Sequence, residues 1–166
     1  MIQWLWFFID CEGRSVIIDD MMLISKKTAD IINAQKPIDQ TILERVKKAL
    51  ARKGVILHQS RDTDEWLVSK GAEAVTFSDC TIVMHTNVSA SGFFEELIHY
   101  GQIMSGRAMT GNIENNILME IEVKERLIKH QQAYGITDYE VRILTDILNY
   151  YRMELENIGK AGGQHV

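Results

Sequence analysis

The spacing of apolar residues divides the chain into a mixed first half and a helical second half. Between residues 38 and 53, apolar side chains recur every three or four residues, which predicts a helix that Gly54 ends. Runs rich in β-branched residues predict short strands at 55–58, 76–77 and 81–85. Beyond Gly92 the helical spacing returns and predicts helices at about 92–105, 113–134 and 138–157. We therefore expect an α+β fold, with a small β-sheet and a mainly helical C-terminal half.

Several local signals mark where these elements end. Thr137 and Glu140 have the spacing of a capping box at the start of the last helix, and Gly135 is expected to end the helix before it. A further helix is expected at 25–34, before the break at Pro37. The segment that carries Arg61, Asp62, Asp64 and Glu65 is expected to be a polar loop.

The two ends of the chain differ in character from its middle. Residues 1–24 begin with an apolar run of roughly eight residues, where a spanning helix needs about 20, so no membrane span is expected. This segment also lacks the basic region of a signal peptide, and we expect it to dock on the core or to be the remnant of a larger protein. Residues 25–158 are expected to form a single domain. Residues 159–166 are glycine-rich and are expected to form a flexible tail.

Composition narrows the classes of function. The chain has 166 residues, 46% of them hydrophobic and 25% charged, which suits one globular domain with a real core. Its net charge of −5 argues against nucleic acid as a partner. With Cys11 and Cys80 as the only cysteines, a disulfide framework and a four-cysteine zinc site are excluded.

The helix predicted at 92–105 carries the residues most suited to chemistry. Its apolar side collects Phe93, Leu97, Tyr100 and Met104, and its polar side collects Glu95, Glu96, His99 and Gln102. Glu95 and His99 are one turn apart, so both side chains could hold one metal ion, while Glu96 stays free to act on a water molecule. An ordinary solvated helix face shows the same pattern, and that interpretation stays open.

The segment Glu95-Glu96-Leu97-Ile98-His99 is similar to the H-E-x-x-H zinc motif, with glutamate in place of the first histidine. Together with the order of the predicted elements, residues 40–157 resemble the zincin-like metallopeptidase domains of bacterial polymorphic toxins. The resemblance implies a zincin-like fold and a peptidase-like hydrolase that acts on a protein or peptide, with Glu96 as general base. It also implies a role in bacterial competition, action in the cytoplasm after delivery into a target cell, and a cognate immunity protein as partner.

In such domains a glutamate on the helix after the motif completes the metal site. The resemblance favours the segment Glu120-Ile121-Glu122, and Glu122 matches best, so the implied ligands are Glu95, His99 and Glu122. Spacing alone favours Glu125, because it lies nearest the core side that we expect Ile117, Ile121 and Ile128 to define. Glu120 and Glu125 therefore remain alternatives. Zinc is the expected ion, and manganese or iron would also suit a site in which a carboxylate replaces an imidazole.

Other candidates have weaker signals. His85, on a predicted strand, could line a substrate groove, although a single strand histidine is more often structural. A di-iron carboxylate bundle would need a second Glu-x-x-His, which the sequence lacks. Two further functions stay open: a non-catalytic binding domain of the same fold, and a nuclease-type toxin domain neutralised by an immunity protein.

Overall fold

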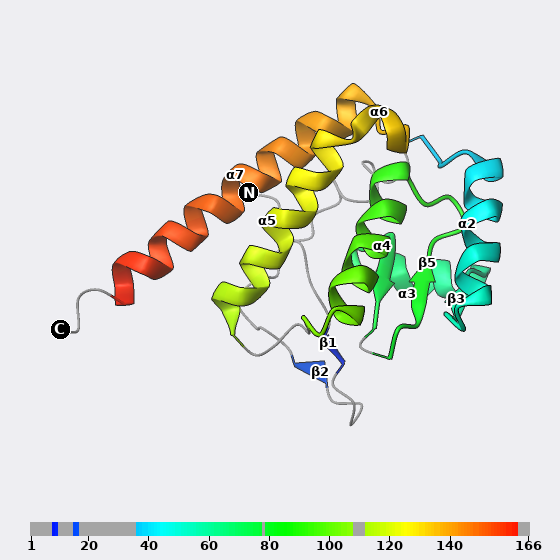
Figure 1. Cartoon of the computed structure of the whole chain (residues 1–166), viewed down its shortest axis with the longest axis horizontal. Helices are drawn as coiled ribbons and strands as arrows, with labels where there is room; N and C mark the ends of the chain where they lie inside the picture. Colours follow the sequence, from blue (N-terminus) through cyan, green and yellow to red (C-terminus); the bar gives the residue numbers. More distant parts are fainter. Residues whose placement is uncertain (1–7, 10–14, 17–35, 78, 108–111, 163–166) are drawn as a thin grey trace. The chain divides into compact units, whose positions relative to one another are not determined.

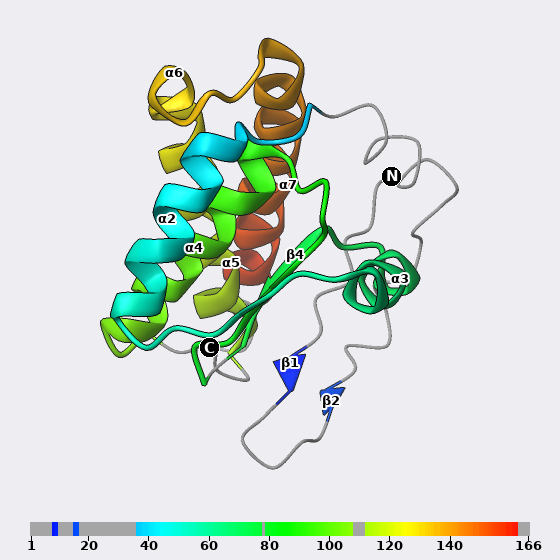
Figure 2. The same cartoon turned by 90° about the vertical axis from the view of Figure 1, so that its right-hand side faces the viewer.

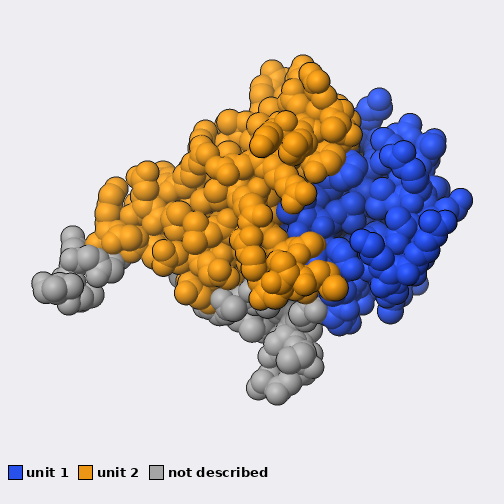
Figure 3. All heavy atoms as spheres, viewed as in Figure 1, with its two compact units in different colours: residues 1–100 blue, residues 101–166 orange. Residues whose placement is uncertain are grey.

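A computed structural model describes the backbone of residues 8–9, 15–16, 36–77, 79–107 and 112–162, and the side chains of 36–77, 79–107 and 112–160 (Figure 1). The chain divides into two compact units, residues 1–100 and 101–166 (Figure 3). Within the N-terminal segment, β1 (Phe8–Ile9) pairs with β2 (Ser15–Val16) in antiparallel orientation. The rest of that segment and the helix expected at 25–34 lie outside the described residues.

The first unit contains a three-stranded mixed sheet in the order β3-β5-β4. The central strand β5 (Ile82–Met84) is parallel to β3 (Leu57–His58) and antiparallel to β4 (Ala74–Thr76). Its residues Ile82 and Met84 are fully buried. Strands β3 and β5 fall within the runs predicted at 55–58 and 81–85 and are shorter than those runs, whereas β4 begins two residues before the run predicted at 76–77 and overlaps it only at Thr76. With the helices described below, this sheet confirms the α+β class.

Helix α2 (Gln40–Arg52) matches the helix predicted at 38–53. The Asp39 carboxylate caps it by accepting hydrogen bonds from the backbone N–H groups of Thr41 at 2.8 Å and Ile42 at 3.1 Å. These bonds, that of Ile42 first, hold the pKa of Asp39 below its ordinary value of 3.8. After the helix, Gly54 adopts a positive φ of 76°, which is the conformation expected of a glycine that follows a helix end.

The Asp39 cap predicts a pH-dependent contribution to stability. Because the folded pKa is depressed, the cap stabilises the protein fully above the unfolded pKa, and this contribution is lost as the pH falls through the folded pKa. Asp39→Ala should therefore lower the urea midpoint by a constant amount between about pH 5 and 7, and by progressively less below about pH 4. Asp39→Asn, a cap without a titrating group, is the control. An Asp39→Ala deficit that did not shrink in acid would contradict this account.

The polar segment after β3 is a helix, and the prediction of a loop there is wrong. Helix α3 (Arg61–Lys70) begins at Ser60, whose hydroxyl accepts a hydrogen bond from the Thr63 backbone N–H, while the Thr63 hydroxyl accepts one from the Ser60 N–H. The acidic residues of its first turn favour a helix N-terminus electrostatically. Only one side chain of α3, Leu67, is buried, and so the apolar periodicity was too sparse to reveal the helix.

Helix α4 (Ala90–Met104) starts at a partly buried carboxylate–hydroxyl cluster. The Glu73 carboxylate accepts hydrogen bonds from the Ser89 backbone N–H at 3.0 Å and from the Ser89 hydroxyl at 2.5 Å. The same hydroxyl oxygen accepts a bond from the N–H of Gly92, as an N-cap does. A Cβ added at Gly92 would lie 2.5–2.9 Å from the Glu73 side chain. Because Gly92 has no side chain, the Glu73 carboxylate can occupy this space.

Gly92→Ala is expected to destabilise the protein by about 1–2 kcal/mol, because the new methyl group displaces a carboxylate that is held by two hydrogen bonds. Gly101→Ala on the same helix is the matched control. A Cβ there meets nothing within 4 Å, so this change should be neutral or stabilising by up to about 1 kcal/mol. Urea denaturation measures both. Equal effects of the two substitutions would refute the steric account.

The second unit contains the last residues of α4 and helices α5 (Ile113–Lys129), α6 (Gln131–Tyr134) and α7 (Asp138–Gly162). Helices α5 and α7 pack side by side (Figures 1 and 2). Their buried apolar residues are Met119, Val123 and Leu127 on α5 and Leu144, Leu148 and Tyr151 on α7. The helix expected at 113–134 is divided at His130, which is the C-cap of α5 and the N-cap of α6.

The start of α7 confirms the predicted capping box. The Glu140 carboxylate accepts hydrogen bonds from the Thr137 N–H and hydroxyl, both at 2.7 Å, and the Glu140 N–H donates to the Thr137 hydroxyl oxygen. Gly135 ends α6 with a positive φ of 70°, as expected. Helix α7 continues to Gly162, four residues into the expected tail. In the described part of the chain, no helix has the length and apolar character needed to cross a membrane.

Candidate metal centre

Three of the four side chains on the polar side of α4 are buried, and the fourth, Glu95, is half-buried. Glu96, His99 and Gln102 expose only 3%, 5% and 4% of their surface, which contradicts the interpretation of this side as ordinary solvated surface. The predicted apolar side is only partly buried: Phe93 is fully buried, whereas Met104 is 62% exposed. Polar groups are buried in proteins at a cost unless they have polar partners. Their burial on one helix therefore points to a polar network or a bound cation.

The C-terminal turn of α4 lies against α5. Within the second unit, the Gln102 side-chain amide donates a hydrogen bond of 3.2 Å to the backbone carbonyl of Met119. His99 precedes Gln102 by three residues on the same helix and therefore points to the same side. Because Glu120 follows Met119 directly, this bond holds the C-terminal turn of α4 next to the part of α5 that carries Glu120.

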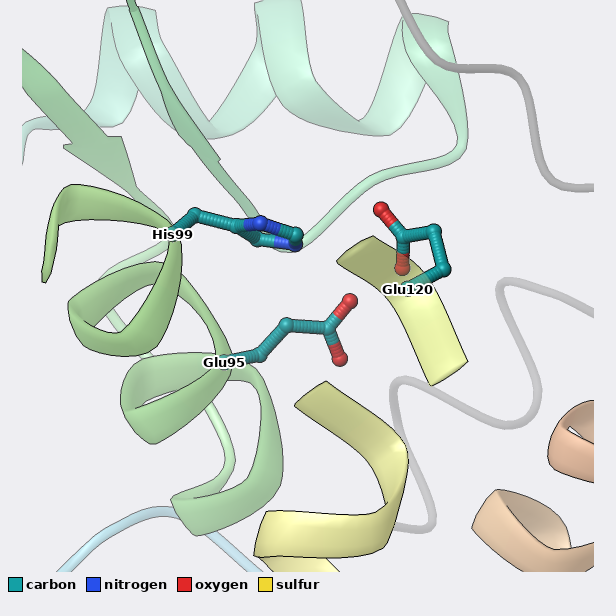
Figure 4. A group of neighbouring side chains, drawn as sticks. All are labelled: Glu95, His99 and Glu120. Carbon is teal, nitrogen blue, oxygen red and sulfur yellow. The ribbon is translucent and has the colours of Figure 1, made fainter. Parts of the chain in front are cut away.

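Three side chains offer donor atoms close together, as Figure 4 shows. Glu95 and His99 extend from α4 and Glu120 extends from α5, and one donor atom from each lies within 4.8 Å of the other two. Two carboxylate oxygens and one imidazole nitrogen form a donor set that binds divalent transition ions in proteins. Glu95, His99 and Glu120 could therefore hold a metal ion. The pairing of Glu95 with His99 was expected from their spacing.

Glu120 takes the place that the resemblance gives to Glu122. The Glu122 carboxylate is 43% exposed and is ion-paired with Arg107, and the Glu125 carboxylate is 51% exposed and is ion-paired with Arg152. Glu120, by contrast, exposes only 4% of its surface.

The physical reason is the rotation of α5. We expected Ile117, Ile121 and Ile128 to face the core, but these residues are only half-buried. The fully buried stripe is Met119, Val123 and Leu127. Glu120 lies beside that stripe on the helix surface and is buried with it.

Lys124 is the residue of this region that sequence analysis missed. Its ammonium nitrogen lies 3.7 Å from a Glu120 carboxylate oxygen, and the two side chains are only 4% and 5% exposed. Glutamate and lysine four residues apart on a helix form a favourable pair, so the pairing itself was readable from the sequence. Its burial was not readable, because that depends on the rotation of α5.

His85 lies in a separate hydrogen-bonded loop after β5. Its Nδ1 accepts a hydrogen bond of 3.0 Å from the Asn87 N–H, and its Nε2 lies 3.8 Å from the Asp64 carboxylate. Asp64 in turn accepts a hydrogen bond of 2.7 Å from the Thr86 N–H. These contacts give His85 a clear role in holding the loop, and its role in binding substrate stays a prediction.

Comparisons of the chain with family models, curated proteins and solved structures gave no match. Function is therefore inferred from the site itself. Three features of the site bear on it: the Glu95–His99 spacing, the burial of most of the polar side of α4, and the position of Glu120 on α5.

Proposed function

We propose that this protein is a metal-dependent hydrolase that acts on proteins or peptides. The observation that carries the proposal is the convergence of Glu95, His99 and Glu120 on one point (Figure 4). A second supporting feature is the order of residues on α4, where a carboxylate that is not in the ligand group directly follows Glu95 and precedes His99 by three positions. This is the order of the H-E-x-x-H helix with a glutamate as its first ligand.

The residues fit a divalent ion in charge and in donor type. Two carboxylates balance the charge of a dication, and the imidazole suits zinc, manganese and iron alike. Three protein ligands leave coordination positions for substrate and water, as catalytic sites require. We propose zinc as the ion, with manganese or iron as the alternatives that the second carboxylate favours.

In this proposal Glu96 is the general base. Glu95, His99 and Glu120 would hold the divalent ion, which when bound would supply Lewis-acid activation of a water molecule and of the scissile carbonyl. The Glu96 carboxylate accepts the proton of the attacking water and passes it to the departing amine. The 3% exposure of Glu96 suits this task, because it keeps bulk water away from the carboxylate.

The wider biological role follows from the resemblance to toxin domains. We propose that the domain is zincin-like and is delivered into competing bacteria, where an immunity protein neutralises it in the producing cells. Growth arrest on expression in the bacterial cytoplasm would support this role. If the protein is instead a non-catalytic binding domain, the Glu96→Gln variant should arrest growth as strongly as the wild type. If it is a nuclease, RNA or DNA should be degraded in the arrested cells.

Metal binding is tested by thermal unfolding with and without added ion. At a free ion concentration 100 times Kd, binding stabilises the folded state by about 2.7 kcal/mol, which raises the Tm by about 5–10 °C for a chain of this size. His99→Ala should abolish this rise, whereas His58→Ala, which removes an exposed histidine, should retain it. A wild-type Tm that zinc, manganese and iron all leave unchanged would contradict the proposed function.

A further inference from the structure

We propose that Lys124 is a built-in counter-ion that competes with the divalent ion for Glu120 and thereby weakens metal binding. This inference rests on the proposed metal site and concerns how that site is regulated. In the metal-free protein, the ammonium group neutralises Glu120. When a metal ion binds, the Glu120 carboxylate interacts with two positive charges, the ion and the Lys124 ammonium.

The Glu120–Lys124 pair is unusual in its burial. Lysine and glutamate are almost never fully buried unless they are paired, because removing their charges from water is costly. Here the ammonium and the carboxylate are 3.7 Å apart, and less than a tenth of either side chain is exposed. A pair that served only to support the helix would do so equally well at the surface. Its position at the candidate ligand Glu120 indicates a role in the site.

Competition follows from charge and distance. Glu120 contributes to the ligand group with one carboxylate oxygen, and the ammonium lies at that same carboxylate. An ion held by Glu95, His99 and Glu120 would therefore bind close to Lys124. The two positive charges repel each other, and little solvent is present to screen them.

This arrangement would give the site a threshold. At low concentrations of free ion, Lys124 keeps the buried Glu120 compensated, so the empty site does not destabilise the fold. At higher concentrations, mass action fills the site despite the repulsion from the ammonium. The affinity is lower than that of the same ligands without Lys124, and binding becomes selective for conditions rich in the ion.

The direct test compares ion affinity in lysine variants by titration with manganese and, separately, with zinc. Lys124→Met should bind both ions at least about tenfold more tightly than the wild type, a change of about 1.4 kcal/mol. Lys129→Met, an exposed lysine of the same helix, is the matched control and should stay within about twofold of the wild type. Lys124→Gln serves as a second variant should Lys124→Met not fold.

The outcomes separate this inference from the proposed function. Equal affinity of the wild type and the Lys124 variants would overturn the inference and leave the metal site in place. If Lys124→Met binds manganese or zinc and the wild type binds neither, the result would support the inference and contradict metal-dependent activity of the natural chain. No binding by any variant would overturn both.

A readout without metal tests the other half of the inference. In metal-free protein, Lys124→Met should lower the urea midpoint, because it leaves Glu120 buried without its counter-ion. The double variant Glu120→Gln with Lys124→Met should recover most of that loss. A midpoint that Lys124→Met leaves unchanged would overturn the role of Lys124 as counter-ion.

Discussion

Glu96→Gln is expected to slow hydrolysis of an unfolded protein substrate by about 10²- to 10⁴-fold, because it removes the proposed general base and retains the shape of the side chain. Fluorescence release from labelled casein in the presence of zinc or manganese measures the rate. The substitution is expected to leave the ligand group of Glu95, His99 and Glu120 in place. The loss should therefore fall on kcat while ion binding stays near the wild-type value.

Two controls make this result specific. Glu114→Gln changes an exposed glutamate in the first turn of α5 and should keep the wild-type rate. Ion titration of Glu96→Gln should give a wild-type stoichiometry, which separates loss of the base from loss of the site. Wild-type hydrolysis by Glu96→Gln would remove Glu96 from the mechanism.

Phe93→Ala is expected to destabilise the protein by about 3–5 kcal/mol. Phe93 is fully buried, and its ring packs edge-to-face against Phe94 with centroids 5.2 Å apart. Truncation to alanine removes this apolar surface from the core and leaves a cavity. Urea denaturation followed by circular dichroism measures the loss.

The matched control for Phe93 is Met104 at the other end of the same helix. Met104 is 62% exposed, so Met104→Ala should change stability by no more than about 0.5 kcal/mol. The sequence places both residues on one apolar side of α4, and the structure separates them. Similar losses for the two variants would contradict the burial described for α4.

The elements of the fold were predictable wherever a strong local signal was present. Apolar spacing located α2, and the Thr137–Glu140 capping box located the start of α7. Helix α3 was missed, because a helix with Leu67 as its buried side chain carries almost no apolar periodicity. Its Ser60–Thr63 capping box was the signal that could have revealed it.

The candidate site was predictable only in part, for a geometric reason. The Glu95–His99 pair depends on the spacing of residues within one helix, which the helical geometry fixes. The third ligand depends on how α5 is rotated, and competition between two apolar stripes decides that rotation. The stripe of Met119, Val123 and Leu127 is buried in preference to that of Ile117, Ile121 and Ile128. As a result, the neighbouring Glu120 and Lys124 are buried as well.

The most direct test of the central claim is the metal content of the purified protein. After dialysis against zinc or manganese and removal of excess ion, elemental analysis of the wild type should give about one ion per chain. His99→Ala and Glu120→Gln should each retain far less than the wild type, whereas Glu122→Gln should match it. Wild-type protein without bound ion, or equal ion content in His99→Ala, would contradict a metal centre formed by Glu95, His99 and Glu120.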